Sequence, residues 1–345
     1  MSLALRKKYF MSIRQPATEQ QIILGVTGLY QSSTSLTRTD DAVGMTWSMV
    51  NNEIVSDFDS VFPFNKMKKQ TVDGNEMVYV PKMYWRFTKD ASDYITSVAV
   101  SNMPFVAQSG QVVGQTEAFY YGAYKGSVSN SKLSSKTGVA PQYSQTRATF
   151  RTQAQANGSG YQIVDLVHTN ILEMLWLIEF ATKNSDSVMK GYTYGGTTGA
   201  TDNLTKPSGQ LSVGGRMRYR YIEDFIGNGY EFFDGITGYY ATANPSQYAD
   251  SQVGTQFSGS GIANEWNLNA LGFVDETQPL LIVPKLALSN TSYNTYFCDQ
   301  VTCESGERVY MRGRNSTGSY DGLCSWLSYA YTFTHASVGS RLIKI

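Results

Sequence analysis

Four acidic residues lie close enough together in the sequence to suggest acid–base chemistry. They are Glu223, Asp224, Glu231 and Asp234, and they are interspersed with aromatic residues and glycines. Two carboxyl groups flanking a sugar are what a glycosidase requires. Acids in such a glycine-rich segment also accept hydrogen bonds from loop backbone at a bend. The residues alone leave a catalytic and a structural role open.

Cysteine and histidine are too scarce for most thiol or metal chemistry. The chain has three cysteines, Cys298, Cys303 and Cys324, and two histidines, His168 and His335. Two widely separated histidines cannot build a zinc-type cluster, and an odd number of cysteines does not fit a secreted disulfide framework. We expect structural or incidental cysteines, a locally bonded His168, and no metal or other cofactor. A structural calcium ion held by Asp and Asn side chains stays open.

The C-terminal stretch 308–345 has the composition of a recognition surface. Its middle is rich in Tyr, Ser, Thr, Asn and Gly and poor in aliphatic residues. Rigid rings with small polar neighbours supply contact area and adaptable hydrogen bonds in antibody paratopes. In a strand over 328–335, alternation would place the aromatic side chains on one face. Those side chains are Tyr329, Tyr331, Phe333 and His335. Such a row is a binding surface if exposed and an ordinary sheet core if buried.

Charge and hydropathy exclude several classes of partner. Only 16% of the 345 residues are charged, and 28 basic residues balance 28 acidic ones. This composition argues against nucleic acid or an anionic membrane as partner. No run of apolar residues is long enough to span a membrane, and the N-terminus lacks the apolar segment of a signal peptide. We therefore expect synthesis in a reducing cytoplasm and no membrane insertion.

Two helices should position these residues. The first is predicted over Thr146–Ala156, and Asn157-Gly158 provides a stop signal after it. The second is predicted near Asn170–Lys183, where Asn170 and Glu173 have the spacing of a capping box. Its residues are apolar almost all round, so this helix must be buried on most sides.

Short strands and long polar loops make up the rest of the chain. Strands are predicted at Gln21–Val26, Met77–Phe87 with an edge or bulge at Pro81, Ala118–Gly126, Tyr161–Val164 and Pro279–Pro284. Ser340–Ile345 is expected to be a closing strand that pairs with Arg308–Met311. This order indicates an α+β fold with short strands, two helices and long loops. We expect a small N-terminal segment, 1–74, before a larger domain, 75–345.

Three motifs give the larger domain a family resemblance. The run 222–232, IEDFIGNGYEF, is similar to the signature GNVWEW and departs from it at Gly229, Tyr230 and Phe232. VYMRGR at 309–314 resembles LRGGSW, and VGSRL at 338–342 resembles GFRL. Together these motifs resemble the C-type lectin-like fold, in the subtype shared by formylglycine-generating enzymes and the variable proteins of diversity-generating retroelements. The likeness covers about residues 75–345 and implies that the four acids are structural. The implied scaffold residues are Gly227, Asn228, Glu231, Gly339 and Arg341.

Upstream segments point to a setting for this domain. Residues 37–44, 56–59 and 62–64 look like parts of tail or receptor-binding proteins of phages and prophages. With the lectin-like resemblance, they imply a non-enzymatic phage tail-tip protein in the virion, made in the bacterial cytoplasm and related to diversified tropism determinants. Its expected partners are a host-surface protein or glycan receptor, other phage tail proteins and further copies of itself in a homo-oligomer such as a trimer. Residues 1–74 would serve tail attachment or oligomerisation.

The same resemblance implies a ligand surface in a variable region at about 308–345. Its expected contact residues are Tyr310, Arg312, Arg314, Asn315, Ser316, Ser319, Tyr320, Asp321, Cys324, Trp326, Ser328, Tyr329, Tyr331, Phe333 and His335.

Two enzymes and one adhesin remain as alternatives. A formylglycine-generating oxidase needs its cysteine pair just after the strand at 309–314, but Cys298 and Cys303 precede that strand and only Cys324 follows it. A lone cysteine cannot supply the paired-thiol copper site that the family implies. The calcium-dependent sugar-binding motifs EPN and WND are also missing. A polysaccharide-cleaving tail enzyme and a diversified cellular surface adhesin are the other readings.

Overall fold

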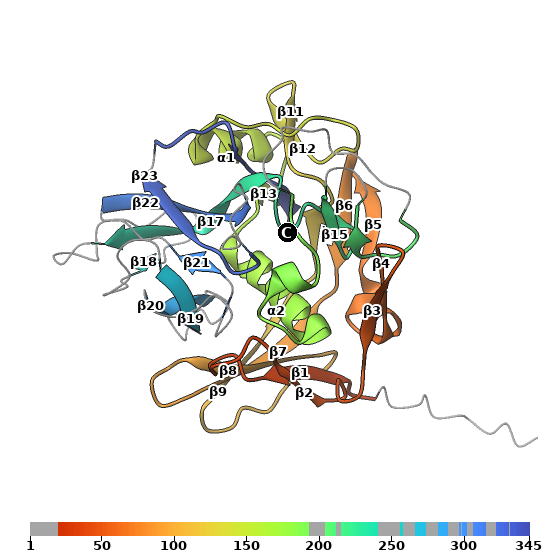
Figure 1. Cartoon of the computed structure of the whole chain (residues 1–345). Coiled ribbons are helices and arrows are strands. Elements are labelled where there is room, and N and C mark those ends of the chain that lie inside the picture. The colour runs from red at the N-terminus through yellow and green to blue at the C-terminus, as the bar shows by residue number, and fades with distance from the viewer. Residues whose placement is uncertain are drawn as a thin grey trace, which may run out of the picture.

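The computed structural model describes residues 20–192, 204–211, 215–240, 256–257, 266–273, 282–288, 297, 299–301, 306–314, 322–330 and 332–345. These residues form many short strands around two α-helices, which is an α+β arrangement (Figure 1).

Helix α1 spans Arg147–Gln155, in agreement with the sequence prediction. The hydroxyl oxygen of Thr146 caps the helix by accepting a hydrogen bond from the Thr149 backbone N–H at 3.1 Å. Beyond the helix, Gly158 has a φ of +116°, a conformation that favours glycine.

Helix α2 spans Leu166–Phe180 and begins four residues earlier than Asn170, where the sequence predicted its start. Asp165 is the cap, because its carboxylate accepts from the His168 backbone N–H at 2.8 Å. The same carboxylate lies 2.8 Å from His168 Nδ1, so this histidine is bonded locally as expected, although inside the helix. Asn170 caps nothing and donates its side-chain N–H to the Ile282 carbonyl at 3.1 Å.

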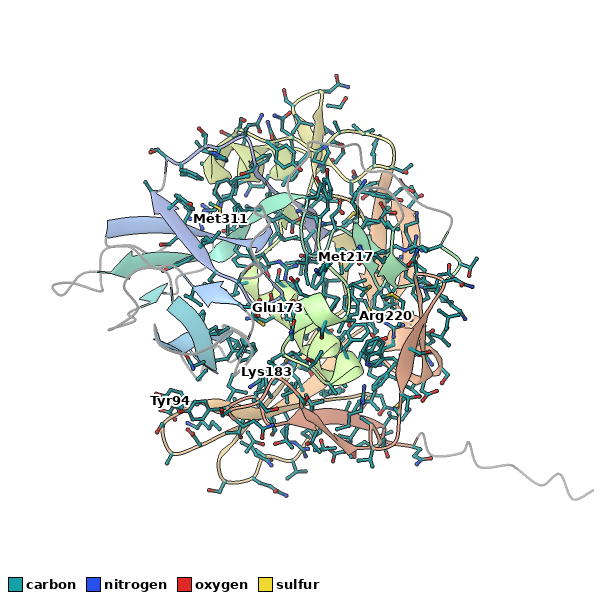
Figure 2. All side chains as sticks on the ribbon, in the orientation of Figure 1. Tyr94, Glu173, Lys183, Met217, Arg220 and Met311 are labelled. Carbon is teal, nitrogen blue, oxygen red and sulfur yellow. The ribbon has the colours of Figure 1, made fainter. Side chains whose placement is uncertain are left out.

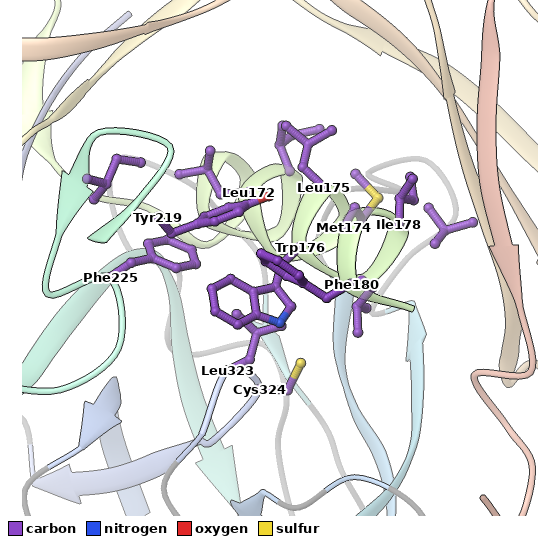
Figure 3. Packing of buried hydrophobic residues seen from close by; sticks show 14 of the residues in the cluster. Leu172, Met174, Leu175, Trp176, Ile178, Phe180, Tyr219, Phe225, Leu323 and Cys324 are labelled. Atoms are coloured by element: carbon purple, nitrogen blue, oxygen red, sulfur yellow. The ribbon is translucent and has the colours of Figure 1, made fainter. Parts of the chain in front are cut away.

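Every residue of α2 except Val167 is buried, as its apolar sequence predicted. Trp176 packs against Phe180 and Tyr219, with ring centroids 4.6 and 4.8 Å away (Figure 3). We call the apolar cluster around this helix the α2 core. A second cluster under α1, which includes Phe150, Phe232 and Met311, is the α1 core.

Two five-stranded sheets hold much of the N-terminal half together with the chain's end. The first has the order β2 (Thr37–Asp40), β1 (Ile23–Thr27), β8 (Ile95–Ser101), β7 (Met83–Lys89) and β9 (Gln111–Thr116). The second has the order β13 (Tyr161–Ile163), β25 (Leu342–Lys344), β10 (Phe119–Gly122), β6 (Asn75–Val80) and β5 (Lys68–Val72). The predicted run Met77–Phe87 is therefore two strands in different sheets, and the chain leaves one sheet for the other at Pro81.

Further strands form four other sheets. One has the order β16 (Ile222–Glu223), β15 (Met217–Tyr219), β14 (Gly209–Gln210), β4 (Glu53–Ser56) and β3 (Trp47–Val50). Another has β18 (Gln256–Phe257), β17 (Gly229–Tyr240), β22 (Gly306–Arg314) and β23 (Leu327–Ala330), and β24 (Val338–Gly339) also pairs with β17. The smaller ones are β20 (Ile282–Leu288), β19 (Trp266–Phe273) and β21 (Gln300–Val301), and the pair β11 (Ser127–Ser129) and β12 (Lys132–Ser134).

The closing strand does not pair with Arg308–Met311, so that prediction was wrong. Strand β25 pairs with β10 and β13, whereas β22 pairs with β17 and β23. Burial explains the difference, because Leu342 belongs to the α1 core and Ile343 to the α2 core. The strand can fill both cores only from a position between them.

The expected boundary near residue 74 falls in the turn between β5 and β6, which pair along their length. Strand β1 likewise pairs with β8. Residues 20–74 therefore share sheets and core with later parts of the chain. Their role in tail attachment or oligomerisation stays a prediction.

Candidate ligand-binding surface

Strands β22 and β23 divide the predicted contact residues between two faces of one sheet. In their register, Val309 lies opposite Tyr329 and Tyr310 lies opposite Ser328. Residues that face each other across antiparallel strands point to the same side. Because Val309 belongs to the α1 core and Tyr310 to the α2 core, Tyr329 and Ser328 point in opposite directions.

Five residues expected to contact ligand are buried instead. They are Tyr310, Arg312, Cys324, Trp326 and Ser328. The Trp326 ring packs against those of Tyr310 and Phe233, with centroids 5.3 and 5.6 Å away. Cys324 belongs to the α2 core (Figure 3). These side chains lie on the side of the α2 core, so they support the sheet rather than form a surface.

Three of the predicted residues do come together at the surface. Tyr329 and Phe333 are half-buried and His335 is exposed. The Phe333 ring stacks on Tyr329 at 4.0 Å and on His335 at 6.0 Å, with interplanar angles of 16° and 4°. We call these three residues the ring cluster.

A turn, and not the predicted strand over 328–335, creates the ring cluster. Strand β23 ends at Ala330, and the Phe333 backbone N–H donates to the Ala330 carbonyl at 2.8 Å. The chain therefore folds back and places Phe333 over Tyr329. The predicted strand over 328–335 was therefore wrong, although three of its four aromatic residues do stack on one another.

The loop that carries the ring cluster is fixed at its base. The His335 carbonyl accepts from the backbone N–H groups of Ser144 and Val338 at 3.1 and 3.0 Å. His335 Nδ1 lies 2.6 Å from the Ser337 hydroxyl. The Tyr143 hydroxyl donates to the Asn228 carbonyl at 2.7 Å, which links the segment before α1 to the start of β17.

In β17 of the same sheet, the predicted scaffold residue Glu231 joins two buried cations. Its carboxylate accepts from Lys125 Nζ at 3.1 Å and from Arg341 Nε at 2.8 Å. Burial alone would raise the pKa of Glu231, but attraction to Arg341, Lys125 and Arg312 outweighs it and lowers the pKa to about 2. Burial lowers the pKa of Lys125 to about 8 despite its contact with Glu231.

The other scaffold residues close the bend around Glu231. Gly339 lies beside Glu231 in the parallel pairing of β24 with β17. Asn228 Nδ2 donates to the Asp224 carboxylate at 2.9 Å. Gly227 has a φ of +97° and lies against the backbone of Tyr192. Together these contacts hold the start of β17 against the chain's end.

Two acids of α2 have a role that the sequence analysis missed. Glu173 accepts from Arg312 Nη1 at 2.8 Å, and Glu179 accepts from Arg220 Nε at 2.9 Å. Burial raises the pKa of Glu173 to about 7, although Arg312 opposes that shift. Glu173 lies near the middle of the molecule (Figure 2). A glutamate in a helix that is apolar all round was the available signal, since a buried acid must find a cation.

The residues considered for catalysis are inaccessible in the described structure. Glu223, Asp224, Glu231 and Asp234 are all buried. Arg216 Nε donates to Asp224 at 2.9 Å, and Arg151 Nε donates to Asp234 at 2.8 Å. Among the described residues, no three His, Cys, Asp or Glu side chains are grouped to hold a metal ion.

Several predicted positions lie outside the described residues. They are Asn315, Ser316, Ser319, Tyr320, Asp321, Tyr331, Cys298 and Cys303. Arg314 is the last residue of β22.

Comparisons with known proteins do not assign the chain to a family. No family model matches the chain, and no curated protein does. Among solved structures, the chain is similar to PvdO from Pseudomonas aeruginosa, with a TM-score of 0.33 and 11% identity over 81% of this chain and 97% of that one. This likeness is too distant to define a family. None of the described helices has the length and apolar character needed to cross a membrane.

Proposed function

We propose that the chain is a non-enzymatic binding protein with a C-type lectin-like fold, acting as a receptor-binding protein at a phage or prophage tail tip. The observation that carries the proposal is the ring cluster of Tyr329, Phe333 and His335. Its rings stack at the surface, and the loop that bears them is held by backbone hydrogen bonds at His335. Aromatic side chains on a rigid support commonly supply most of the energy of a recognition surface. The tail-tip setting rests on the resemblance of segments 37–44, 56–59 and 62–64 to phage tail proteins.

The chemistry of the surface favours a neutral contact area on a host protein or glycan. Thr332 and Thr334, the sequence neighbours of Phe333, are also exposed, so hydroxyl side chains accompany the rings at the surface. This is the combination that paratopes use. Burial of the four acids and of Cys324 supports binding over hydrolysis or thiol-dependent oxidation.

Binding to intact cells tests this proposal. Fluorescent full-length protein is added to the bacterium that carries the gene and to related strains, and bound fluorescence is measured by flow cytometry. A double variant, Tyr329→Ala with Phe333→Ala, should weaken binding about 30-fold, the effect of losing roughly 2 kcal/mol at a hot spot.

A second aromatic pair provides the matched control. Tyr79 and Tyr120 are also half-buried, with ring centroids 5.6 Å apart, in a different sheet. Their double alanine variant should bind cells like the wild type. Equal losses in both variants would contradict a role for the ring cluster, and shortening of capsule polysaccharide on incubation would favour a tail enzyme.

Sequencing the gene's 3′ end across a population tests diversification separately. Substitutions should gather at Tyr329, Phe333 and His335 and spare the buried Tyr310 and Trp326. If all five codons are uniform across the population, the region is not diversified, and the protein would be a binder of fixed specificity.

A further inference from the structure

Exposed apolar side chains gather on one hairpin far from the ring cluster in sequence. Within the described residues, seven large hydrophobic residues are exposed, and four of them lie between residues 43 and 55. They are Val43, Met49, Val50 and Val55, with exposed fractions of 67%, 39%, 51% and 43%. Three of these belong to strands β3 and β4.

Strand β3 forms the edge of its sheet. The sheet order ends with β4 and then β3, and β3 lies at the periphery of the molecule (Figure 1). On the inner face, Trp47 donates its ring N–H to the Phe180 carbonyl at 3.3 Å, which holds the strand to the end of α2. The strand is thus anchored on one side and open on the other.

The hairpin geometry shows which backbone groups face the open side. Asn51 and Asn52 form a tight turn with φ of 51° and 66°, so the flanking Val50 and Glu53 exchange hydrogen bonds. The next pair, Met49 with Ile54, is then the type whose backbone groups point away from each other. The Ile54 N–H does point away, donating to the Ser208 carbonyl at 2.9 Å. By the same alternation, the N–H and C=O of Met49 face outward.

Strand β3 lacks the usual protection of an exposed edge. Proteins commonly place charges or proline on edge strands to prevent pairing with other chains. Edge strand β2 carries Arg38 and Asp40, and edge strand β5 carries Lys68 and Lys69. Strand β3, with the sequence WSMV, has neither charge nor proline.

We propose that β3 pairs with β3 of a second copy of this chain, antiparallel and centred on Met49. A second copy is the occupant that this edge fits, because its own Met49 presents the matching outward N–H and C=O, and the two uncharged strands meet without repulsion. A two-fold axis at Met49 places Met49 opposite Met49 on the inner face and Ser48 opposite Val50 on the outer face, where the Val50 side chains of the two copies become diagonal neighbours. The pairing is independent of ligand binding by the ring cluster.

The dimer should be weak and reversible. Four residues of strand bury less surface than the roughly 1,200 Å² of a standard stable interface. Association should therefore depend on concentration.

Sedimentation velocity of the full-length protein over a concentration series tests the pairing. The wild type should change from monomer to dimer as concentration rises. Met49→Pro removes an N–H that faces outward and leaves the hydrogen bonds to β4, so it should raise the dissociation constant at least tenfold. Met49→Lys should do the same by adding charge, which keeps the test valid if the proline variant folds poorly. Val139→Lys, at a residue that is 42% exposed elsewhere, is the matched control and should dimerise like the wild type.

Three outcomes would overturn the proposal. The wild type could remain monomeric at all concentrations, which would leave the edge unpaired or reserved for a strand of another protein. A dimer unaffected by either Met49 variant would place the interface elsewhere. A closed trimer would exclude it too, since two-fold edge pairing stops at two copies. Loss of cell binding in the ring-cluster variant would affect none of these results.

Discussion

The Phe333 ring lies nearly parallel to the Tyr329 ring, with centroids 4.0 Å apart. The two residues are four positions apart in sequence, and the turn after Ala330 brings them together. Both rings pack partly on the α1 core while remaining half exposed. Stability and ligand contact should therefore respond differently to their removal.

Replacing Phe333 by Ala should cost little stability. A stacked pair contributes about 0.5–1.5 kcal/mol beyond the area it buries. Phe150→Ala, in the fully buried part of the same core, should cost about 3–5 kcal/mol. Urea unfolding of both variants measures the free energies of unfolding. Similar losses would mean that Phe333 is a core residue and not part of a surface.

Glu231→Gln should be among the most destabilising single substitutions. It leaves Lys125 and Arg341 buried without their shared anion, and breaking a buried ion pair costs about 3–5 kcal/mol. The control is Glu117→Gln, because the Lys82–Glu117 pair at 2.7 Å is exposed to solvent, which screens it, so its loss should change stability little. Thermal unfolding measures the melting temperatures of the two variants. Equal decreases would show that Glu231 does not stabilise Lys125 and Arg341 more than an exposed ion pair would.

Local patterns in the sequence predicted the elements better than their partners. The all-round apolar character of 170–180 required a buried helix, and Thr146 with Asn157-Gly158 bounded α1. Asn170 was mistaken for a cap because it has the right spacing to Glu173, yet Asp165 is the residue that bonds the first turn. Strand pairing depends on contacts between distant segments, which local periodicity does not encode.

The same limit explains which site residues were missed. Alternation in β22 and β23 separates the two faces of the sheet, but only the packing of distant segments puts one face on the α2 core and the other on the α1 core, with Tyr329 left half exposed at its margin. Trp326 and Tyr329 look equally suited to recognition in the sequence, and one is buried while the other is half exposed. Arg312 was expected to contact ligand, but its side chain pairs with Glu173. The two residues are 139 positions apart in sequence, so local patterns could not reveal the pairing.

Gly229→Ala should destabilise the base of the ring cluster. Gly229 has a φ of +87°, and the Ser337 carbonyl oxygen lies 2.6 Å from where a Cβ would be. Gly74→Ala is the matched control, since its φ is +78° but nothing lies within 4 Å of the added atom. The control should cost about 1–2 kcal/mol from backbone conformation alone, and Gly229→Ala should cost more. Equal costs in urea unfolding would show that the Ser337 loop moves freely.

Glu223 should make the protein less stable as pH rises. Burial raises its pKa to about 8 in spite of Arg216, and neither carboxylate oxygen has a hydrogen-bond partner among the described residues. The folded state therefore keeps a proton on Glu223 at pH values where the unfolded chain, with an ordinary pKa of 4.5, has lost it. Stability from this group is complete below about pH 4.5 and is lost as pH rises through about 8.

Glu223→Gln isolates that contribution, because glutamine resembles the protonated acid and does not titrate. The variant should match the wild type near pH 5 and become the more stable protein near pH 8, by on the order of 1.4 kcal/mol for each unit of pKa shift. Glu173, whose pKa is also raised by burial, adds a slope of the same sign to both proteins, so only the difference between them reports Glu223. Urea unfolding at several pH values measures this difference. A difference that stays constant with pH would mean that Glu223 is ionised in the folded protein, held as an anion by Arg216, whose Nη2 lies 3.7 Å away.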